Sequence, residues 1–302
     1  MILAESAETV ETGVGRWFFI RLLWYVQGER MTFAVHPITA SLGAEITGID
    51  LADISRDAAE ELRRVWLEHK VLVLRDQHIT QEQHIAFGRM FGELEVHPFT
   101  LNDSDHPEIV VLEAGGDTGS TFVAAGWHSD VPWRAEPSMG SILRGVVVPP
   151  VGGDTCFADA GRAYQRLSDE WKERVDGLVA VHDFVKVFGE RVTEGKEEEM
   201  REKYPIQHHP VIRTHPETGE KVIYTNTAFT SHIEGVSPEE SEAILRHLEW
   251  QITRPSVQCR VRWQKDTFVM WDNRSAQHAA TNDFLPAHRR MERVTVIGDR
   301  PF

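Results

Sequence analysis

The chain has 302 residues, of which 41% are hydrophobic and 26% charged, as is typical of a globular protein with a sizeable core. Its formal net charge of −15 argues against a nucleic acid or an anionic membrane as partner, because no basic face is available to neutralise phosphates. The two cysteines, Cys156 and Cys259, have the spacing of neither a metal site nor a disulfide framework. We therefore expect a reduced, cytoplasmic setting.

The first thirty residues differ from the rest. Residues 14–26 are strongly apolar, but two arginines interrupt them, and they fall short of the roughly 18 to 20 apolar residues that a membrane span needs. A basic leader and a small-residue cleavage site are also missing, so a signal peptide is disfavoured. We predict that residues 1–30 are an extension outside the domain and that residues 31–302 form a single domain. A membrane-surface anchor is the alternative reading of residues 1–30.

From residue 32 onward, strand and helix patterns alternate. Residues 32–49 read as short strands, and Ser55 caps a helix with a single apolar face. The apolar run 71–76 has the length of a strand buried on both faces. Residues 80–83 have the Thr-x-x-Gln pattern of a capping box, which predicts a second helix that ends before Gly92.

Strand patterns dominate the remainder, with helices between them. A hairpin is expected around residues 216–219, and Ser237-Pro238 predicts a helix start. The charged run 194–203 favours a solvated helix, with a mobile lid as the alternative. The remaining expected strands cover residues 108–112, 139–148, 155–157, 257–263, 267–271 and 291–297. We predict a β-rich α+β fold, a double-stranded β-helix (jelly-roll) barrel with helices packed outside.

The segment His128-Ser129-Asp130 carries the first chemical signal. In His-x-Asp on a β-strand, the alternation of side chains sends both potential ligands to the same face. A third ligand from elsewhere, such as His278, completes a set of two histidines and one carboxylate, the arrangement of non-heme Fe(II) oxygenases. With fifteen histidines in the chain, this motif alone is weak evidence. A structural zinc site in a non-catalytic β-barrel is the alternative, although structural zinc usually has four protein ligands.

A second signal lies in residues 289–293. On a strand, Arg289 and Arg293 share one face, and two guanidiniums facing the interior without an adjacent acid are costly unless an anion meets them. The planar guanidinium suits bidentate binding of a carboxylate or sulfonate. The alternative is that these arginines lie on the surface in salt bridges.

Together these motifs resemble the taurine dioxygenase and 2,4-dichlorophenoxyacetate dioxygenase family of Fe(II)- and 2-oxoglutarate-dependent oxygenases, most closely its taurine dioxygenase branch. The resemblance covers residues 31–302. It is carried by four motifs in family order: Trp127-His128-Ser129-Asp130, Gly152-Gly153-Asp154-Thr155, Trp271-Asp272-Asn273-Arg274 with Gln277-His278, and residues 289–293.

The resemblance implies a role for each matching residue. His128, Asp130 and His278 match the iron ligands, and Arg289 matches the partner of the distal carboxylate of 2-oxoglutarate, assisted by the Thr155 hydroxyl. Iron, 2-oxoglutarate and O2 are thus the implied cofactor and cosubstrates. The implied substrate-binding positions are His97, Thr100, Ala124, Phe188, Phe229 and Arg293.

Two of these positions depart from the taurine enzyme. Thr100 stands where that enzyme has a tyrosine, and Ala124 stands where it has an asparagine, so two polar contacts to a small zwitterion are lost. The implied activity is hydroxylation of a small anionic organic substrate, a sulfonate or a sulfate ester, with succinate, CO2 and, for sulfonates, sulfite and an aldehyde as products. The same chemistry on an aryloxyalkanoate or an amino-acid derivative is the alternative. The resemblance also implies a homo-oligomer, a dimer or tetramer.

Overall fold

The computed structural model describes residues 32–97, 103, 105–118, 126–186 and 195–302 in full. For residues 187 and 188, and for the strands before residue 31, it describes the backbone alone. Among those early strands, β1 (Ala4–Thr12) pairs antiparallel with β2 (Gly15–Leu23), and β3 (Tyr25–Val26) pairs with β4 (Glu29–Arg30). The assignment of residues 1–30 to an extension stays a prediction.

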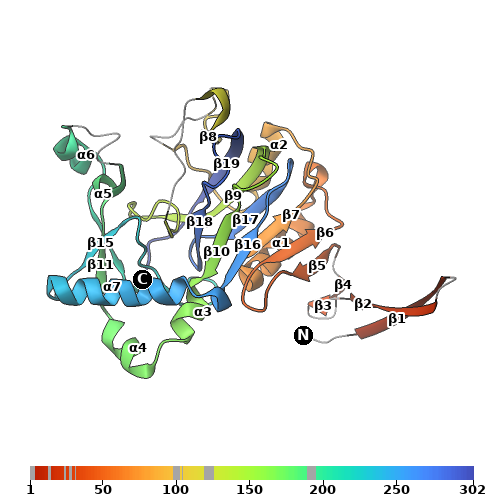
Figure 1. Cartoon of the computed structure of the whole chain (residues 1–302), viewed down its shortest axis with the longest axis horizontal. Helices are drawn as coiled ribbons and strands as arrows, with labels where there is room; N and C mark the ends of the chain where they lie inside the picture. The colour runs from red at the N-terminus through yellow and green to blue at the C-terminus, as the bar shows by residue number, and fades with distance from the viewer. Residues whose placement is uncertain are drawn as a thin grey trace.

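The sheet with the most strands has seven, in the order β5-β6-β7-β17-β9-β19-β8. All its pairings are antiparallel except that of β6 with β7. Figure 1 shows helices α1 and α2 beside this sheet. The strands are β5 (Ala34–Pro37), β6 (Ala44–Thr47), β7 (Val71–Leu74), β8 (Val110–Ala114), β9 (Ser138–Val147), β17 (Phe268–Asp272) and β19 (Arg289–Ile297).

Smaller sheets complete the β structure. One has the order β16-β10-β18, built from β16 (Gln258–Val261), β10 (Thr155–Asp159) and β18 (Ala276–Ala280). Another has the order β12-β11-β15, built from β12 (Gln207–Pro210), β11 (Val179–His182) and β15 (Thr230–Ile233). The predicted hairpin is confirmed as β13 (Ile212–Thr214) paired with β14 (Lys221–Ile223).

Local sequence signals account for the starts of the longer helices. The Ser55 side chain accepts a hydrogen bond from the Ala58 amide at the start of α1 (Arg56–His69), and Thr80 forms the predicted capping box with Gln83 at α2 (Gln81–Arg89). Ser237 caps α7 (Pro238–Ile252), which has proline in its first turn. The shorter helices are η1 (Leu51–Asp53), η2 (Gly116–Thr118), α3 (Ala160–Gln165), α4 (Asp169–Val175), α5 (Phe184–Phe188), α6 (Glu197–Lys203) and η4 (Pro255–Val257).

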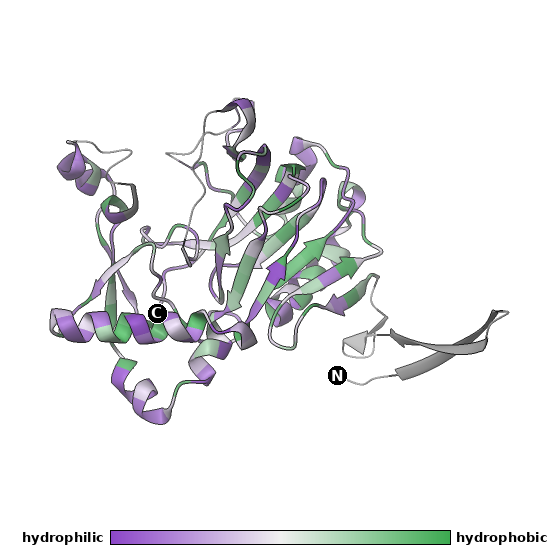
Figure 2. Ribbon diagram, in the orientation of Figure 1, coloured by the Kyte–Doolittle hydropathy of each residue, from purple (hydrophilic) through white to green (hydrophobic). Residues whose placement is uncertain are grey.

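The sheet separates two hydrophobic clusters, and β7 contributes to both. Leu72 and Leu74 pack into the cluster that includes α1 and α2, whereas Val71 and Val73 pack into the cluster that includes β10 and β16. All four side chains are buried, which confirms the prediction of a strand covered on both faces. Figure 2 shows hydrophobic colouring along the central strands and a mixture of both colours along α7.

The β-rich α+β class predicted from the sequence is confirmed. The strand pairings of the described residues give separate sheets rather than the trace of a closed barrel. Within the described residues, no helix is long and apolar enough to cross a membrane.

Candidate metal centre and cosubstrate site

Three ligand-type side chains that are far apart in the sequence meet at one point. The backbone N–H of His128 donates to the carbonyl of His278 at 3.0 Å, and the N–H of His278 donates back to His128 at 2.8 Å. This isolated bridge brings the two imidazole centroids to 4.2 Å. Asp130 lies two residues further on, and all three side chains are buried.

The donor atoms fit a single divalent ion. The Nε2 atoms of His128 and His278 each lie 4.0 Å from Asp130 Oδ1, and potential ligand atoms of the three residues lie within 4.8 Å of one another. Bonds to nitrogen or oxygen of about 2.0–2.2 Å at right angles hold ligand atoms about 3 Å apart, so binding would draw these side chains roughly 1 Å closer to one another. Two imidazoles and one carboxylate with further positions left open are typical of non-heme iron rather than structural zinc.

The surroundings of the two imidazoles fix their orientation differently. His128 Nδ1 donates to the Gly126 carbonyl at 2.9 Å, which leaves Nε2 for a metal. The His278 ring packs 4.7 Å from the Trp271 ring and 6.0 Å from the Phe157 ring, and its Nδ1 has no hydrogen-bond partner among the described residues. Backbone pairing and aromatic packing therefore position His278.

The electrostatics leave all three groups in the protonation state that binds metal. Burial lowers the pKa of His278 to about 3 and also lowers the pKa of His128, so both rings are neutral at pH 7. Burial opposes ionisation of Asp130, but Arg293 and the two histidines outweigh it and lower the pKa of this carboxyl. Neutral imidazoles and an ionised carboxylate are the forms that coordinate a cation.

The prediction that His-x-Asp lies on a β-strand is wrong. His128 makes only the isolated bridge, and Asp130 lies in irregular backbone, with φ of 100° at Gly126 and 58° at Val131. These positive φ values break a continuous strand, because extended backbone needs negative φ. His278, in contrast, lies on β18, a strand that was not predicted.

Arg289 lies at the start of β19 and is buried without an ion-pair partner among the described residues. Its guanidinium lies 5.8 Å from the Phe284 ring centroid, and the Cβ-less backbone of Gly153 packs against its side chain. Burial lowers the pKa of Arg289 to about 10, partly offset by Asp154. A desolvated guanidinium of this kind is costly until an anion binds it.

Thr155 occupies β10, where it pairs with Ala280 of β18. Its hydroxyl oxygen accepts a hydrogen bond from Trp263 Nε1 at 3.0 Å. Because a hydroxyl also carries one donor, the Thr155 proton is left to bond an acceptor such as a carboxylate.

Of the predicted substrate-binding residues, Arg293 is the one that contacts a ligand-type side chain by a hydrogen bond within the described residues. Its Nη1 donates to Asp130 Oδ1 at 2.7 Å, while its Nε is buried and has no hydrogen-bond partner within the part of the chain that the structure describes. The Phe229 ring centroid lies 6.1 Å from that of His128, and buried His97 packs edge-on to Trp133 at 6.2 Å. Thr100, Ala124 and the side chain of Phe188 lie outside the described residues.

Residues that motif reading did not assign surround the carboxylate. Ser141 Oγ donates to Asp130 Oδ2 at 2.6 Å, and Asn273 Oδ1 accepts from the Asp130 amide at 3.0 Å. Asn273 is part of the Trp271-Asp272-Asn273-Arg274 motif, so the sequence pointed to the segment without giving its role. Ser141 lies within β9 and has no motif of its own.

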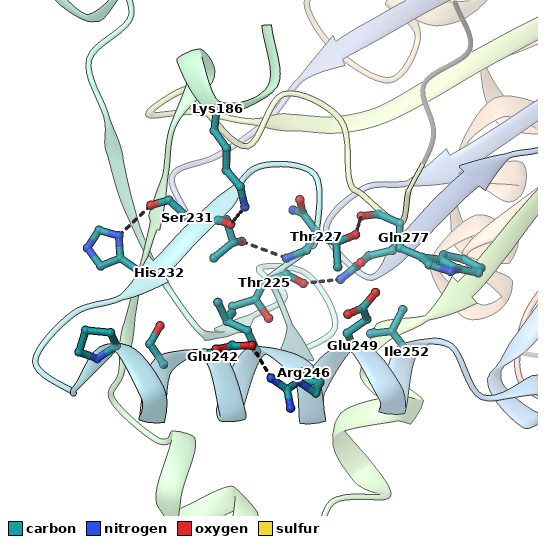
Figure 3. A pocket seen from close by; sticks show the side chains of 16 residues that line it. Lys186, Thr225, Thr227, Ser231, His232, Glu242, Arg246, Glu249, Ile252 and Gln277 are labelled. Carbon is teal, nitrogen blue, oxygen red and sulfur yellow. Dashed lines mark hydrogen bonds and ion pairs between the residues drawn. The ribbon is translucent and has the colours of Figure 1, made fainter. Parts of the chain in front are cut away.

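A separate cavity of about 450 Å³ lies between α7 and the segment 225–232. Figure 3 shows Glu242, Arg246 and Glu249 on α7 along one side, with Lys186 across from them. Its lining includes Trp127 and Gln277, the chain neighbours of His128 and His278, but none of the three ligand-type residues. On β18, alternate side chains point to opposite faces, so Gln277 lines this cavity while His278 belongs to the metal centre.

Comparison with known proteins assigns the chain to a family. Residues 34–295 match the family described as taurine catabolism dioxygenase TauD, TfdA family. The chain belongs to this family. The resemblance inferred from the motifs is thereby confirmed, and the TauD/TfdA enzymes depend on Fe(II) and 2-oxoglutarate.

Three curated relatives of this TauD/TfdA member are named for different activities. An alkylsulfatase of Acinetobacter baylyi is 33% identical over 91% of this chain and 88% of its own length. An alpha-ketoglutarate-dependent sulfate ester dioxygenase of Pseudomonas putida is also 33% identical, over 88% of this chain and 90% of its own. A (S)-phenoxypropionate/alpha-ketoglutarate-dioxygenase of Sphingobium herbicidovorans is 32% identical, over 88% and 96%.

Solved structures of other proteins agree with this assignment. A taurine dioxygenase from Burkholderia xenovorans superposes with a TM-score of 0.78 at 36% identity, covering 89% of this chain and 91% of that one. AAD-2, solved in complex with Mn(II) and N-oxalylglycine, gives a TM-score of 0.77 at 30% identity, covering 90% and 99%.

Proposed function

We propose that this TauD/TfdA member is a 2-oxoglutarate-dependent dioxygenase that hydroxylates a small organic sulfate ester or sulfonate. His128, Asp130 and His278 would hold Fe(II), which when bound couples O2 activation to the oxidative decarboxylation of 2-oxoglutarate. The observation that carries the proposal is the buried guanidinium of Arg289, which has no ion-pair partner among the described residues, in a chain that also brings this triad together. A metal-binding barrel without turnover would leave that cost uncompensated.

In this proposal Arg289 and Thr155 bind the distal carboxylate of 2-oxoglutarate. The guanidinium would form paired hydrogen bonds to the two carboxylate oxygens, and the Thr155 hydroxyl would donate a third. Arg289 is only 7% exposed, and hydrogen bonds made in such a desolvated site are stronger than those in water. These bonds would fix the orientation of the bound cosubstrate.

Arg293 is our proposed binding group for the substrate anion. It donates to Asp130, and its Nε, which no described residue accepts from, is left to bind sulfate or sulfonate oxygens. The buried apolar cluster that contains Val131, Val185 and Phe229 reaches the metal centre through Phe229, whose ring lies 6.1 Å from that of His128, and we propose that Phe229 contacts the organic part of the substrate. His97 and the undescribed positions Thr100, Ala124 and Phe188 remain proposed contacts to the substrate.

The proposed reaction consumes one O2 and one 2-oxoglutarate per substrate. One oxygen atom goes to succinate, with release of CO2, and the other becomes a hydroxyl on the carbon next to the anionic group. A sulfonate then collapses to sulfite and an aldehyde, whereas a sulfate ester gives sulfate and an aldehyde. Both collapses are net redox-neutral eliminations that need no further residue.

An aryloxy acid is the second candidate substrate, because a relative at 32% identity is a phenoxypropionate dioxygenase. A carboxylate would bind Arg293 by the same paired hydrogen bonds. The experiment that separates these substrates is a panel of alkyl sulfates, alkyl sulfonates and aryloxy acids with Fe(II), 2-oxoglutarate and O2. Succinate formed in equal amount with sulfate or sulfite supports the proposal. Succinate coupled only to aryloxy acids would overturn the choice of substrate.

We also propose that the two sheets that contribute β9, β17, β19, β10 and β18 are the two halves of a double-stranded β-helix. Antiparallel pairing around the site and the family's solved structures support this architecture. A homo-oligomer in a reducing, cytoplasmic compartment remains part of the proposal, consistent with Cys156 and Cys259 as free thiols. Light scattering of the purified protein would test the assembly.

A further inference from the structure

The carboxylate of Asp130 is held on both oxygens by different donors. Oδ1 accepts from Arg293 Nη1 at 2.7 Å and is the oxygen 4.0 Å from both imidazole Nε2 atoms. Oδ2 accepts from Ser141 Oγ at 2.6 Å. The two oxygens are therefore not equivalent: one lies among the metal-binding atoms, and the other is bonded to β9.

Asn273 determines the direction of the hydrogen bond from Ser141. Its Oδ1 accepts from the Asp130 amide at 3.0 Å and from Trp271 Nε1 at 2.9 Å. Both groups can only donate, so the carboxamide oxygen must face them and its NH2 must face the other way. There Nδ2 donates to Ser138 Oγ at 2.9 Å and to Ser141 Oγ at 3.1 Å.

The Ser141 hydroxyl consequently has one choice of acceptor. It receives a hydrogen bond from Asn273, so its single proton is directed to Asp130 Oδ2. Asn273 and Ser141 are 2% and 0% exposed, which excludes competing water and strengthens each bond in the chain. A carboxylate rotated to present both oxygens to an ion would have to break this short, buried bond.

We propose that Ser141 and Asn273 are positioning residues that make Asp130 a one-oxygen metal ligand. This inference rests on the proposed function, because it concerns the iron that the three ligands would hold. With two imidazoles and one carboxylate oxygen bound, three of six octahedral positions stay open, two for 2-oxoglutarate and one for O2. A carboxylate bound through both oxygens would occupy one of them. The Asn273–Ser141–Asp130 chain keeps that position free.

The test compares Ser141→Ala, Ser141→Thr and Thr295→Val in the full-length protein. Thr295 on β19 pairs directly across from Ser141, and its buried hydroxyl has no hydrogen-bond partner in the described part of the chain, so Thr295→Val controls for local packing. Each variant is loaded anaerobically with Co(II), whose visible spectrum reports coordination number, and is then titrated with N-oxalylglycine. Removal of a residue that orients a metal ligand typically changes affinity about 10- to 100-fold.

We expect Ser141→Ala to change the Co(II) spectrum and to weaken N-oxalylglycine binding at least tenfold. Ser141→Thr, which keeps the hydroxyl, and Thr295→Val should both behave as wild type. Circular dichroism of the metal-free proteins verifies that each variant is folded, and Asn273→Asp, which replaces the donor to Ser141 by an acceptor, provides a second disruption of the chain. An unchanged spectrum and affinity in both Ser141→Ala and Asn273→Asp would overturn the inference. Failure of the wild-type protein to bind Co(II) and N-oxalylglycine would instead overturn the proposed function.

Discussion

Arg289 and Arg290 are neighbours in β19 with opposite environments. Arg289 is buried without an ion-pair partner among the described residues, whereas Arg290 is half-buried beside Glu113 and Glu292. Alternation along the strand explains the difference, since consecutive side chains point to opposite faces. The pair thus provides a functional residue and its matched control in adjacent positions.

Arg289→Gln should weaken 2-oxoglutarate binding about 30-fold or more, because removal of one partner of a buried charge pair costs about 2 kcal/mol or more. Metal binding should be unchanged, since within the described residues Arg289 makes no hydrogen bond or ion pair with any of the three ligand-type side chains. The measurement is an anaerobic titration of the Fe(II)-loaded protein with 2-oxoglutarate. Equal affinities for Arg289→Gln and Arg290→Gln would refute the role of Arg289.

At the scale of elements, Gly140 of β9 is the residue on which Trp66 of α1 packs. A Cβ at residue 140 would lie 2.3 Å from Trp66 Cη2, and neither the strand nor the fully buried indole has room to move away. This close approach fixes α1 against the sheet that carries Ser141.

Gly140→Ala should therefore lower the free energy of unfolding by about 1–3 kcal/mol, the usual cost of overpacking a core. Trp66→Phe in the same chain removes the ring atoms that collide, so the double variant should be more stable than the sum of the two single changes predicts. Urea denaturation of the four proteins measures this. Strict additivity would show that Trp66 does not restrict residue 140.

The elements that could be predicted are those whose signals are local. Caps at Ser55, Thr80 and Ser237 and the apolar run of β7 marked their helices and strand correctly. β18 could not be found in the same way, because Ala276-Gln277-His278-Ala279-Ala280 has neither alternation nor β-branched residues and is a strand only through its pairing with β10. Irregular backbone at Asp130 has the same cause: the neighbours across the fold, not the local sequence, determine it.

The residues of the candidate site also divide into those that the sequence identifies and those that only the fold reveals. His128, Asp130 and His278 were identifiable because metal chemistry restricts residue type and spacing, and the structure brings them together. Ser141 and Asn273 were not assigned, because serine and asparagine occur in many settings and only the buried network gives them a role. The contact of Arg293 with Asp130 likewise joins residues 163 positions apart in the chain, which no local pattern predicts.

For the whole molecule, buried histidines outside the site predict loss of stability in acid. Burial lowers the pKa of His84 to about 3 from its ordinary value of 6.5, despite the bond from its Nε2 to the Ile142 carbonyl. Between these two pH values the unfolded chain binds a proton that the folded chain does not, so the free energy of unfolding decreases as the pH falls. His182 and His209, with pKa values of about 3 and about 4, act in the same direction.

From pH 7.5 to pH 5.5, His84 alone should remove about 1.4 kcal/mol of stability. His84→Gln should reduce the pH dependence by that amount, whatever its effect at neutral pH, and exposed His36→Gln serves as the control. Urea denaturation at both pH values measures the difference. A pH dependence identical in His84→Gln and wild type would contradict this account of His84.

The central claim is that His128, Asp130 and His278 hold iron to which 2-oxoglutarate binds. Its most direct test is the anaerobic addition of Fe(II) and then 2-oxoglutarate to wild-type protein and to His278→Ala. The wild type should develop a visible metal-to-ligand charge-transfer band that saturates with 2-oxoglutarate, and His278→Ala should develop none and form no succinate on exposure to O2 and substrate. A colourless wild type, or an undiminished band in His278→Ala, would contradict the account.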